Sequence, residues 1–176
     1  MKKKGLLSID RISIYLVLFQ YIPEIAILVS LGLVLIGFKP KLKEVLLIAL
    51  AGSLPFVLIR SLPLIPGTNA FIQLPILVAL TAWICRLHFK HTALAALLGA
   101  IVIALAEKVF NFLTSTFTGI SLQQAFQDLY LRLLFPLPEY IFLIALLLFF
   151  IQYHIALFDI QGLKELEQLK HYEQRE

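Results

Sequence analysis

The last apolar stretch of the chain, residues 139–158, reads EYIFLIALLLFFIQYHIALF. After its first residue it contains no Asp, Glu, Lys or Arg, and it has the length of about 20 residues that a helix needs to cross a bilayer. The rest of the chain resembles this stretch, since 60% of its 176 residues are hydrophobic and the mean hydropathy is +0.92. Such a chain has too little polar surface for water. The sequence therefore predicts an all-α, polytopic membrane bundle.

Outward from this stretch, apolar blocks separated by short charged or turn-rich segments predict a transmembrane domain over residues 1–158. The predicted spans cover about residues 6–22, 23–38, 44–62, 70–87, 92–113 and 139–158. Apolar residues spaced by three and four predict an amphipathic interfacial helix over 120–134. Residues 159–176 have the pattern of a short, charged, cytoplasmic helical tail.

The number of crossings is open between five and six. The first apolar block, residues 12–38, is long for one crossing and short for two. One crossing divides the basic residues almost evenly between the two sides of the membrane, whereas a reversal near Pro23 places nearly all of them on one side. Because cytoplasmic loops are rich in Lys and Arg, the second arrangement is favoured. It gives six hydrophobic segments in the plasma membrane, with both termini in the cytoplasm.

The composition also limits the partners that we expect. The formal net charge of +4 comes from Lys and Arg that flank the spans, so the bilayer and not nucleic acid is the expected partner. No cofactor is expected, and the single cysteine excludes an intramolecular disulfide. Small residues in the predicted fourth span suit close helix contacts, which makes a homo-oligomer plausible. The charged tail is the expected contact for a cytoplasmic signalling protein.

Several polar residues fall in the outer half of the predicted bundle. Ionised groups at that depth are costly unless they are paired or hydrated, so they usually face the bundle interior. These candidate ligand-binding residues are Glu24, Arg60, Glu107, Lys108, Asn111, Arg132 and Glu139. The alternative interpretation is that they are interface anchors and a salt bridge within the bundle.

A second group of reactive residues has the pattern Cys85-x-x-His88-x-x-His91, at the inner end of the predicted third span. A thiolate and two imidazoles are zinc ligands, and a thiol beside an imidazole can act as a nucleophile. The spacing gives only weak support for a zinc site or a catalytic thiol, because positions six apart are rotated away from each other on a helix. The favoured interpretation is a buried cysteine beside cationic interface residues, with no resident metal.

The stretch Leu58-Ile59-Arg60-Ser61-Leu62-Pro63-Leu64-Ile65-Pro66-Gly67-Thr68-Asn69, followed by an apolar span, resembles a segment of a known family. That family is the membrane-spanning sensor region of Firmicute sporulation-type sensor histidine kinases, which carry a GHKL-type ATPase. The order of segments along the chain is also similar. Ile22-Pro23-Glu24 opens a span, and Leu134-Phe135-Pro136-Leu137-Pro138 precedes the last span. The resemblance is to the sensor region without the kinase domains, and it implies a sensor of a two-component signal transduction system.

These observations predict a non-enzymatic membrane sensor or regulatory protein. Its outer polar residues would bind a ligand, and its tail would contact a signalling partner. A small-solute transporter or substrate-binding membrane subunit is the alternative, because Pro55 and Pro75 can open helices to a substrate. A membrane cysteine peptidase that uses Cys85 is a lesser alternative.

Overall fold

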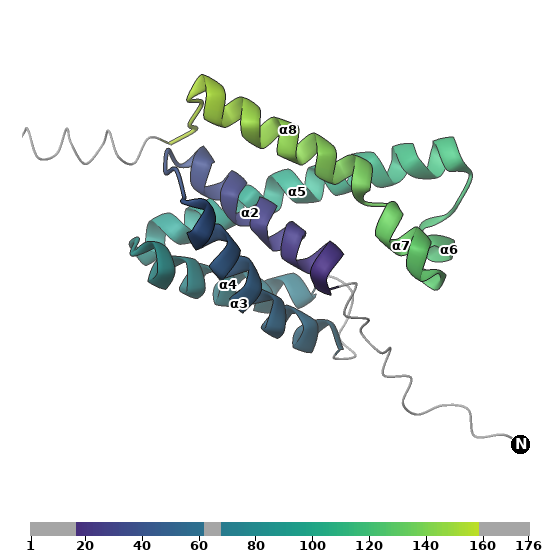
Figure 1. The fold of residues 1–176 in the computed structure, drawn as a ribbon, viewed down its shortest axis with the longest axis horizontal. Helices are drawn as coiled ribbons and strands as arrows, with labels where there is room; N and C mark the ends of the chain where they lie inside the picture. Colours follow the sequence, from purple (N-terminus) through teal and green to yellow (C-terminus); the bar gives the residue numbers. More distant parts are fainter. Residues whose placement is uncertain (1–16, 62–67, 159–176) are drawn as a thin grey trace, which may run out of the picture.

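The computed structural model describes residues 17–61 and 68–158, which form helices and no strand (Figure 1). The helices are the π-helix η1 (Val17–Tyr21), α2 (Ile22–Leu35), α3 (Leu42–Ser61), α4 (Thr68–Cys85), α5 (Phe89–Thr118), α6 (Leu122–Gln127), α7 (Leu129–Leu134) and α8 (Leu137–Tyr153). Four helical runs are long and apolar enough to cross a membrane: Val17–Leu35, Leu42–Ile59, Phe89–Thr118 and Tyr130–Tyr153. A shorter apolar helix covers Ile72–Cys85. The described chain is thus an all-helical bundle with the apolar helices of a multi-pass membrane protein.

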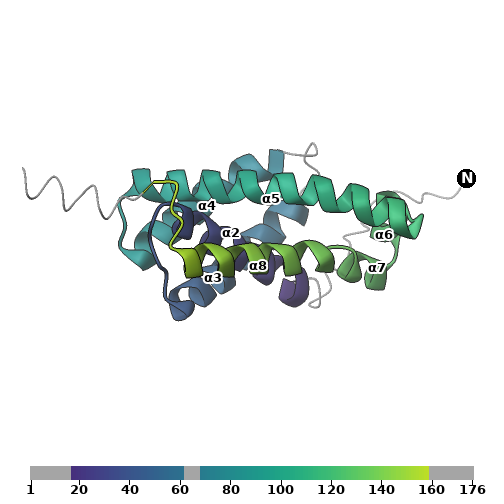
Figure 2. The ribbon, with the colours of Figure 1, turned by 90° about the horizontal axis from the view of Figure 1, so that it is seen from above.

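Helix α2 is the centre of the bundle, and it packs against α3, α5 and α8 (Figures 1 and 2). Its residues are buried almost without interruption from Ile25 to Ile36. By contrast, α3, α5 and α8 each have an exposed apolar face along their length. Examples are Leu50 on α3, Leu105 on α5 and Leu148 on α8. Exposed apolar faces that run along whole helices suit contact with lipid chains.

The most extensive helix contact joins α2 to α5. A side-chain carbon added to Gly32 would overlap the backbone carbonyl of Ala95, and one added to Gly99 would overlap the carbonyl of Leu28. Small residues allow this backbone approach, as they do in other membrane bundles. The small residues Ala95 and Gly99 of α5 are therefore used against α2 of the same chain, rather than left on the surface for a second copy.

The start of α2 corrects one expectation. The helical run is continuous from Val17 to Leu35, so the chain does not reverse near Pro23. Pro23 lies at the start of α2, where the run changes from the π-helix η1 to an α-helix, so its missing backbone N–H coincides with this change of helix type. The rest of the predicted first span lies outside the described residues, as does the predicted tail over 159–176.

The predicted interfacial helix over 120–134 is two short helices, α6 and α7. Asp128 separates them, with an extended backbone (φ −110°, ψ 127°). Its carboxylate accepts a hydrogen bond of 2.9 Å from the backbone N–H of Tyr130, which caps the start of α7. Ser121 and Gln124 form a reciprocal capping box at the start of α6. The chain therefore bends sharply between α5 and α8.

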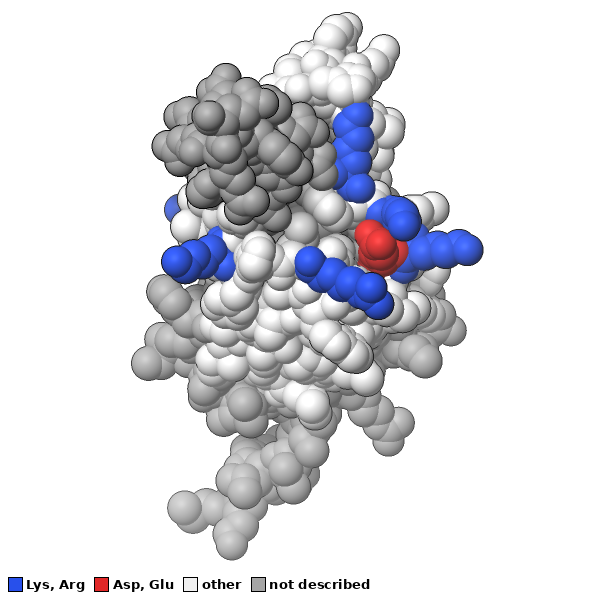
Figure 3. Space-filling model, turned by 90° about the vertical axis from the view of Figure 1, so that its left-hand side faces the viewer, with Lys and Arg blue, Asp and Glu red and all other residues white. Residues whose placement is uncertain are grey.

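The two ends of the bundle differ in charge and shape. The connections from α2 to α3 and from α4 to α5 lie at one end, where Figure 3 shows a girdle of Lys and Arg. The basic residues of these connections are Lys39, Lys41, Lys43, Arg86 and Lys90. At the opposite end α5 extends past its neighbours, since its 30 residues measure about 45 Å at 1.5 Å per residue. Helices α6 and α7 follow this extension and pack mainly on each other (Figure 2).

Candidate site: a polar cavity at the less basic end of the bundle

A cavity of about 150 Å³ lies where the starts of α2 and α8 meet the second half of α5 and the short helices α6 and α7. The helix segments that line it lie at the end of the bundle away from the α2–α3 and α4–α5 connections (Figure 1). Its lining residues are Gln20, Glu24, Ile103, Glu107, Asn111, Ala125, Arg132, Phe135, Pro136, Glu139 and Tyr140. The described lining thus brings together three carboxylates and one guanidinium from four helices.

Helix α5 contributes one wall of the cavity. Ile103, Glu107 and Asn111 are spaced by four residues, and this spacing places them on one face of the helix. Lys108 is the next residue after Glu107, so it projects from another face; it is exposed and does not line the cavity. Glu107 is itself exposed, so a ligand can reach its carboxylate.

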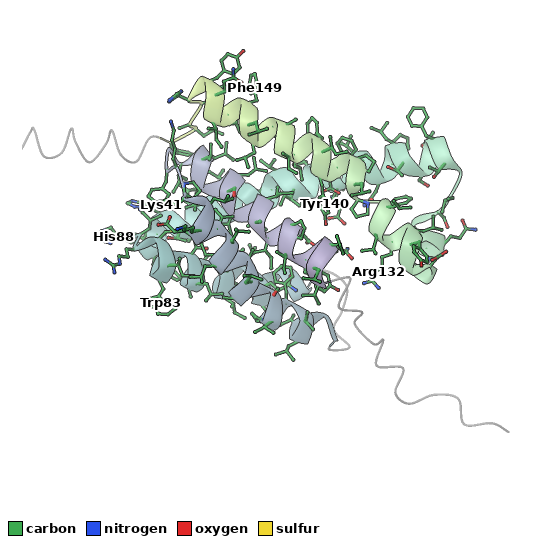
Figure 4. The ribbon with its side chains drawn as sticks, in the orientation of Figure 1. Lys41, Trp83, His88, Arg132, Tyr140 and Phe149 are labelled. Carbon is green, nitrogen blue, oxygen red and sulfur yellow. The ribbon has the colours of Figure 1, made fainter. Side chains whose placement is uncertain are left out.

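The opposite wall comes from η1 and from the first turns of α2 and α8. Gln20 and Glu24 are also spaced by four residues, and both face the cavity. The hydroxyl of Tyr140 donates a hydrogen bond of 3.3 Å to the backbone carbonyl of Gln20, which ties α8 to η1. Figure 4 shows Tyr140 on the side of α8 that faces α2.

Glu139 is the most unusual lining residue, because its side chain is only 5% exposed. Its carboxyl makes no hydrogen bond or salt bridge with the side chains that the structure describes, which do not include that of Arg60. The other charged groups that act on it most strongly are the carboxylates of Glu107 and Glu24. The N-terminal turn of α8 offsets part of the cost, since a helix N-terminus favours negative charge. Buried carboxyl groups without protein partners are rare outside functional sites.

The short helices close the end of the cavity. Arg132 projects from α7 on the side that faces the start of α2 (Figure 4), and Ala125 of α6 is 2% exposed. The capping by Asp128 fixes where α7 begins and therefore where Arg132 lies. A buried small residue at position 125 lets α6 pack closely under the lining side chains.

Of the seven residues predicted from the sequence as a ligand site, five line this cavity: Glu24, Glu107, Asn111, Arg132 and Glu139. Lys108 does not, and the side chain of Arg60 is outside the part that the structure describes. The sequence analysis missed Gln20 and Tyr140. The helical spacing from Glu24 could have indicated Gln20, and the position beside Glu139 could have indicated Tyr140.

The second candidate group does not assemble. Cys85 ends α4, Arg86 turns the chain with φ 52°, and α5 begins at Phe89, so the motif is split between two helices and their connection. The rings of His88 and His91 lie edge to face, with their centres 5.9 Å apart. Among the described residues, no three or more His, Cys, Asp or Glu side chains are grouped closely enough to hold a metal ion.

Comparisons of the chain with models of protein families, with curated proteins and with solved structures found no match.

Proposed function

We propose that this chain is a non-enzymatic sensor or regulatory protein of the cell membrane. In this proposal the cavity binds a ligand at the outer face, and residues 159–176 contact a cytoplasmic signalling partner. Among the described residues, the Lys and Arg of the α2–α3 and α4–α5 connections gather at the end where the tail begins, and this supports the orientation, because cytoplasmic ends of membrane helices are rich in these residues. Helices α6 and α7 then lie at the outer interface, beside the cavity.

One observation carries the proposal: the helices that line the cavity at their starts meet again at their other ends. Leu35, the last residue of α2, accepts hydrogen bonds at its carbonyl from the backbone N–H groups of Leu157 (2.8 Å) and Phe158 (3.1 Å). These two residues follow α8 and immediately precede the tail. A shift of α2 against α8 at the cavity is therefore transmitted to the point where the tail begins.

Helix contacts between the two ends support such a transmission. Leu31 of α2 and Leu143 of α8 are both fully buried and belong to one cluster with Ile27 and Ala106. Tightly packed helices move as rigid units rather than deform locally. A ligand would act by binding one arrangement of α2 and α8 better than another, which is the requirement for any allosteric effect.

The alternative of a transporter predicts an opening near the prolines within helices. Around Pro55 the contact between α3 and α4 is closed, since the space between Gly52 and Gln73 leaves no room for a water molecule. The cavity described above lies instead among α2, α5 and α8. For this reason we favour a sensor over a transporter.

The test compares partner capture by three forms of the full chain in membranes: the unaltered protein, Glu139→Gln, and the chain truncated after Phe158. We expect truncation to abolish capture of the cytoplasmic partner and Glu139→Gln to change its amount. The control is Glu44→Gln, because Glu44 is a partly exposed carboxylate at the basic end that caps α3 through the Lys41 N–H. Capture that survives truncation would contradict the proposal.

A further inference from the structure

The polar atoms of the cavity are mainly acceptors. Three carboxylates line it against one guanidinium, so the described lining has a formal charge of −2 when all four groups are ionised. The side-chain carbonyl oxygen of Gln20 is buried and has no hydrogen-bond partner. The buried carboxyl of Glu139 also has none within the described residues. Acceptors without donors are costly to bury, so a ligand that supplies N–H groups would complete the site.

The acceptors are arranged for a polyatomic cation and not for a metal ion. No group of three carboxylates, imidazoles or thiolates in the described chain is tight enough to hold a single metal ion. Instead Glu24, Glu107 and Glu139 approach the cavity from three helices. A ligand with several N–H groups, separated by carbon atoms, can reach acceptors that are spread in this way.

The size of the cavity limits the ligand further. A cavity of about 150 Å³ holds a molecule of about the size of benzene. Ile103, Ala125, Phe135 and Pro136 supply apolar wall between the acceptors, and this suits a short hydrocarbon chain. A peptide or a lipid is larger than the cavity, so only one end of such a molecule would fit inside it.

We propose that the cavity is a binding site for a small organic cation, a chain of about four to six carbons that carries one or two ammonium groups. Glu139 and Gln20 accept hydrogen bonds from one ammonium group inside the cavity. Glu107, the exposed lining carboxylate, accepts the second at the opening. This inference deepens the proposed function and names the ligand class of its cavity.

The experiment measures binding of four probes to the purified full chain in detergent micelles, at constant ionic strength. The probes are 1,5-diaminopentane, the neutral pentane-1,5-diol, the dianion glutarate and the zwitterion 5-aminopentanoate. We expect the diamine to bind and to raise Tm, and the diol and glutarate to do neither.

We expect Glu139→Gln to weaken diamine binding by about tenfold or more, since it removes a charge-assisted hydrogen bond. Glu44→Gln makes the same chemical change at the far end and should leave binding unchanged.

Because Glu139 is buried, its substitution also affects folding. Glu107→Gln therefore provides a second variant at an exposed position, and it should weaken diamine binding severalfold. The inference is overturned if no probe binds, if the diol, glutarate or 5-aminopentanoate binds as well as the diamine, or if folded Glu139→Gln and Glu107→Gln both keep full diamine affinity. Diamine binding without any change in partner capture would sustain the ligand class and contradict the sensing function. If partner capture depends on the tail but the diamine does not bind, the proposed regulatory function is kept and the ligand class is wrong.

Discussion

Gly99 of α5 lies directly against Gly32 of α2, so that a side-chain carbon on Gly99 would come within 3.3 Å of the Gly32 backbone nitrogen. The same carbon would overlap the carbonyl of Leu28. This crossing holds together the two helices that form facing walls of the cavity. The separation of Glu24 from Glu107 therefore depends on two glycines, each about two helical turns along the same helix from its carboxylate.

Gly99→Ala should destabilise the bundle by about 1–3 kcal/mol, because the methyl group forces two backbones apart. The matched control is Gly52→Ala. There a new carbon would meet only side-chain atoms of Ile25 and Leu77 at 3.6 Å, an ordinary contact. Both variants gain the better helix propensity of alanine, so Gly52→Ala should be neutral or stabilising. Thermal unfolding in detergent measures the difference, and equal Tm values for the two variants would contradict the tight crossing.

The orientation proposed from the girdle of Lys and Arg predicts opposite labelling of the two bundle ends. In a Cys85→Ser background, Lys41→Cys lies at the basic end and Phe117→Cys lies near the end of α5, where the native side chain is 85% exposed. A membrane-impermeant maleimide should label position 117 in intact cells and position 41 only after permeabilisation. Labelling of both positions from the same side would remove the proposed orientation of the cavity.

Much of the cavity could be predicted from the sequence because ionisable residues within apolar helices are rare. Glu107 and Glu139 stand out for this reason, and helical spacing then adds Asn111 to Glu107. Tyr140 and Gln20 could not be paired in the same way. They are 120 positions apart, and only the packing of α8 on α2 brings them into hydrogen-bond contact.

Two errors of the sequence analysis have physical causes. A proline is accommodated equally in a turn and in the first turn of a helix, so Pro23 alone could not distinguish a reversal from the start of α2. Asp128 fits the polar face of an amphipathic helix, but it fits equally as the cap of a new helix. In each case the pattern permits both structures, and tertiary packing decides between them.

The cap at Asp128 predicts a local effect on the helix that carries Arg132. Asp128→Ala removes the acceptor of the Tyr130 N–H and should destabilise the start of α7 by about 1 kcal/mol. Asp128→Asn keeps a good capping oxygen and serves as the control. Hydrogen exchange of the Tyr130 amide should accelerate severalfold in the first variant and little in the second. Unchanged exchange in both would mean that packing alone holds α7.

The link between α2 and the start of the tail predicts a distinct effect at the opposite end. The Leu35 carbonyl is among the last of α2 and lacks a partner within the helix, so it depends on the N–H groups of Leu157 and Phe158. Leu157→Pro removes the shorter bond, of 2.8 Å, and should weaken this contact by about 1 kcal/mol. Ala156→Pro is the control, because that N–H makes no hydrogen bond in the described chain. A spin label at Gln161→Cys should become more mobile only in Leu157→Pro, and equal mobility in both variants would exclude α2 as the anchor of the tail.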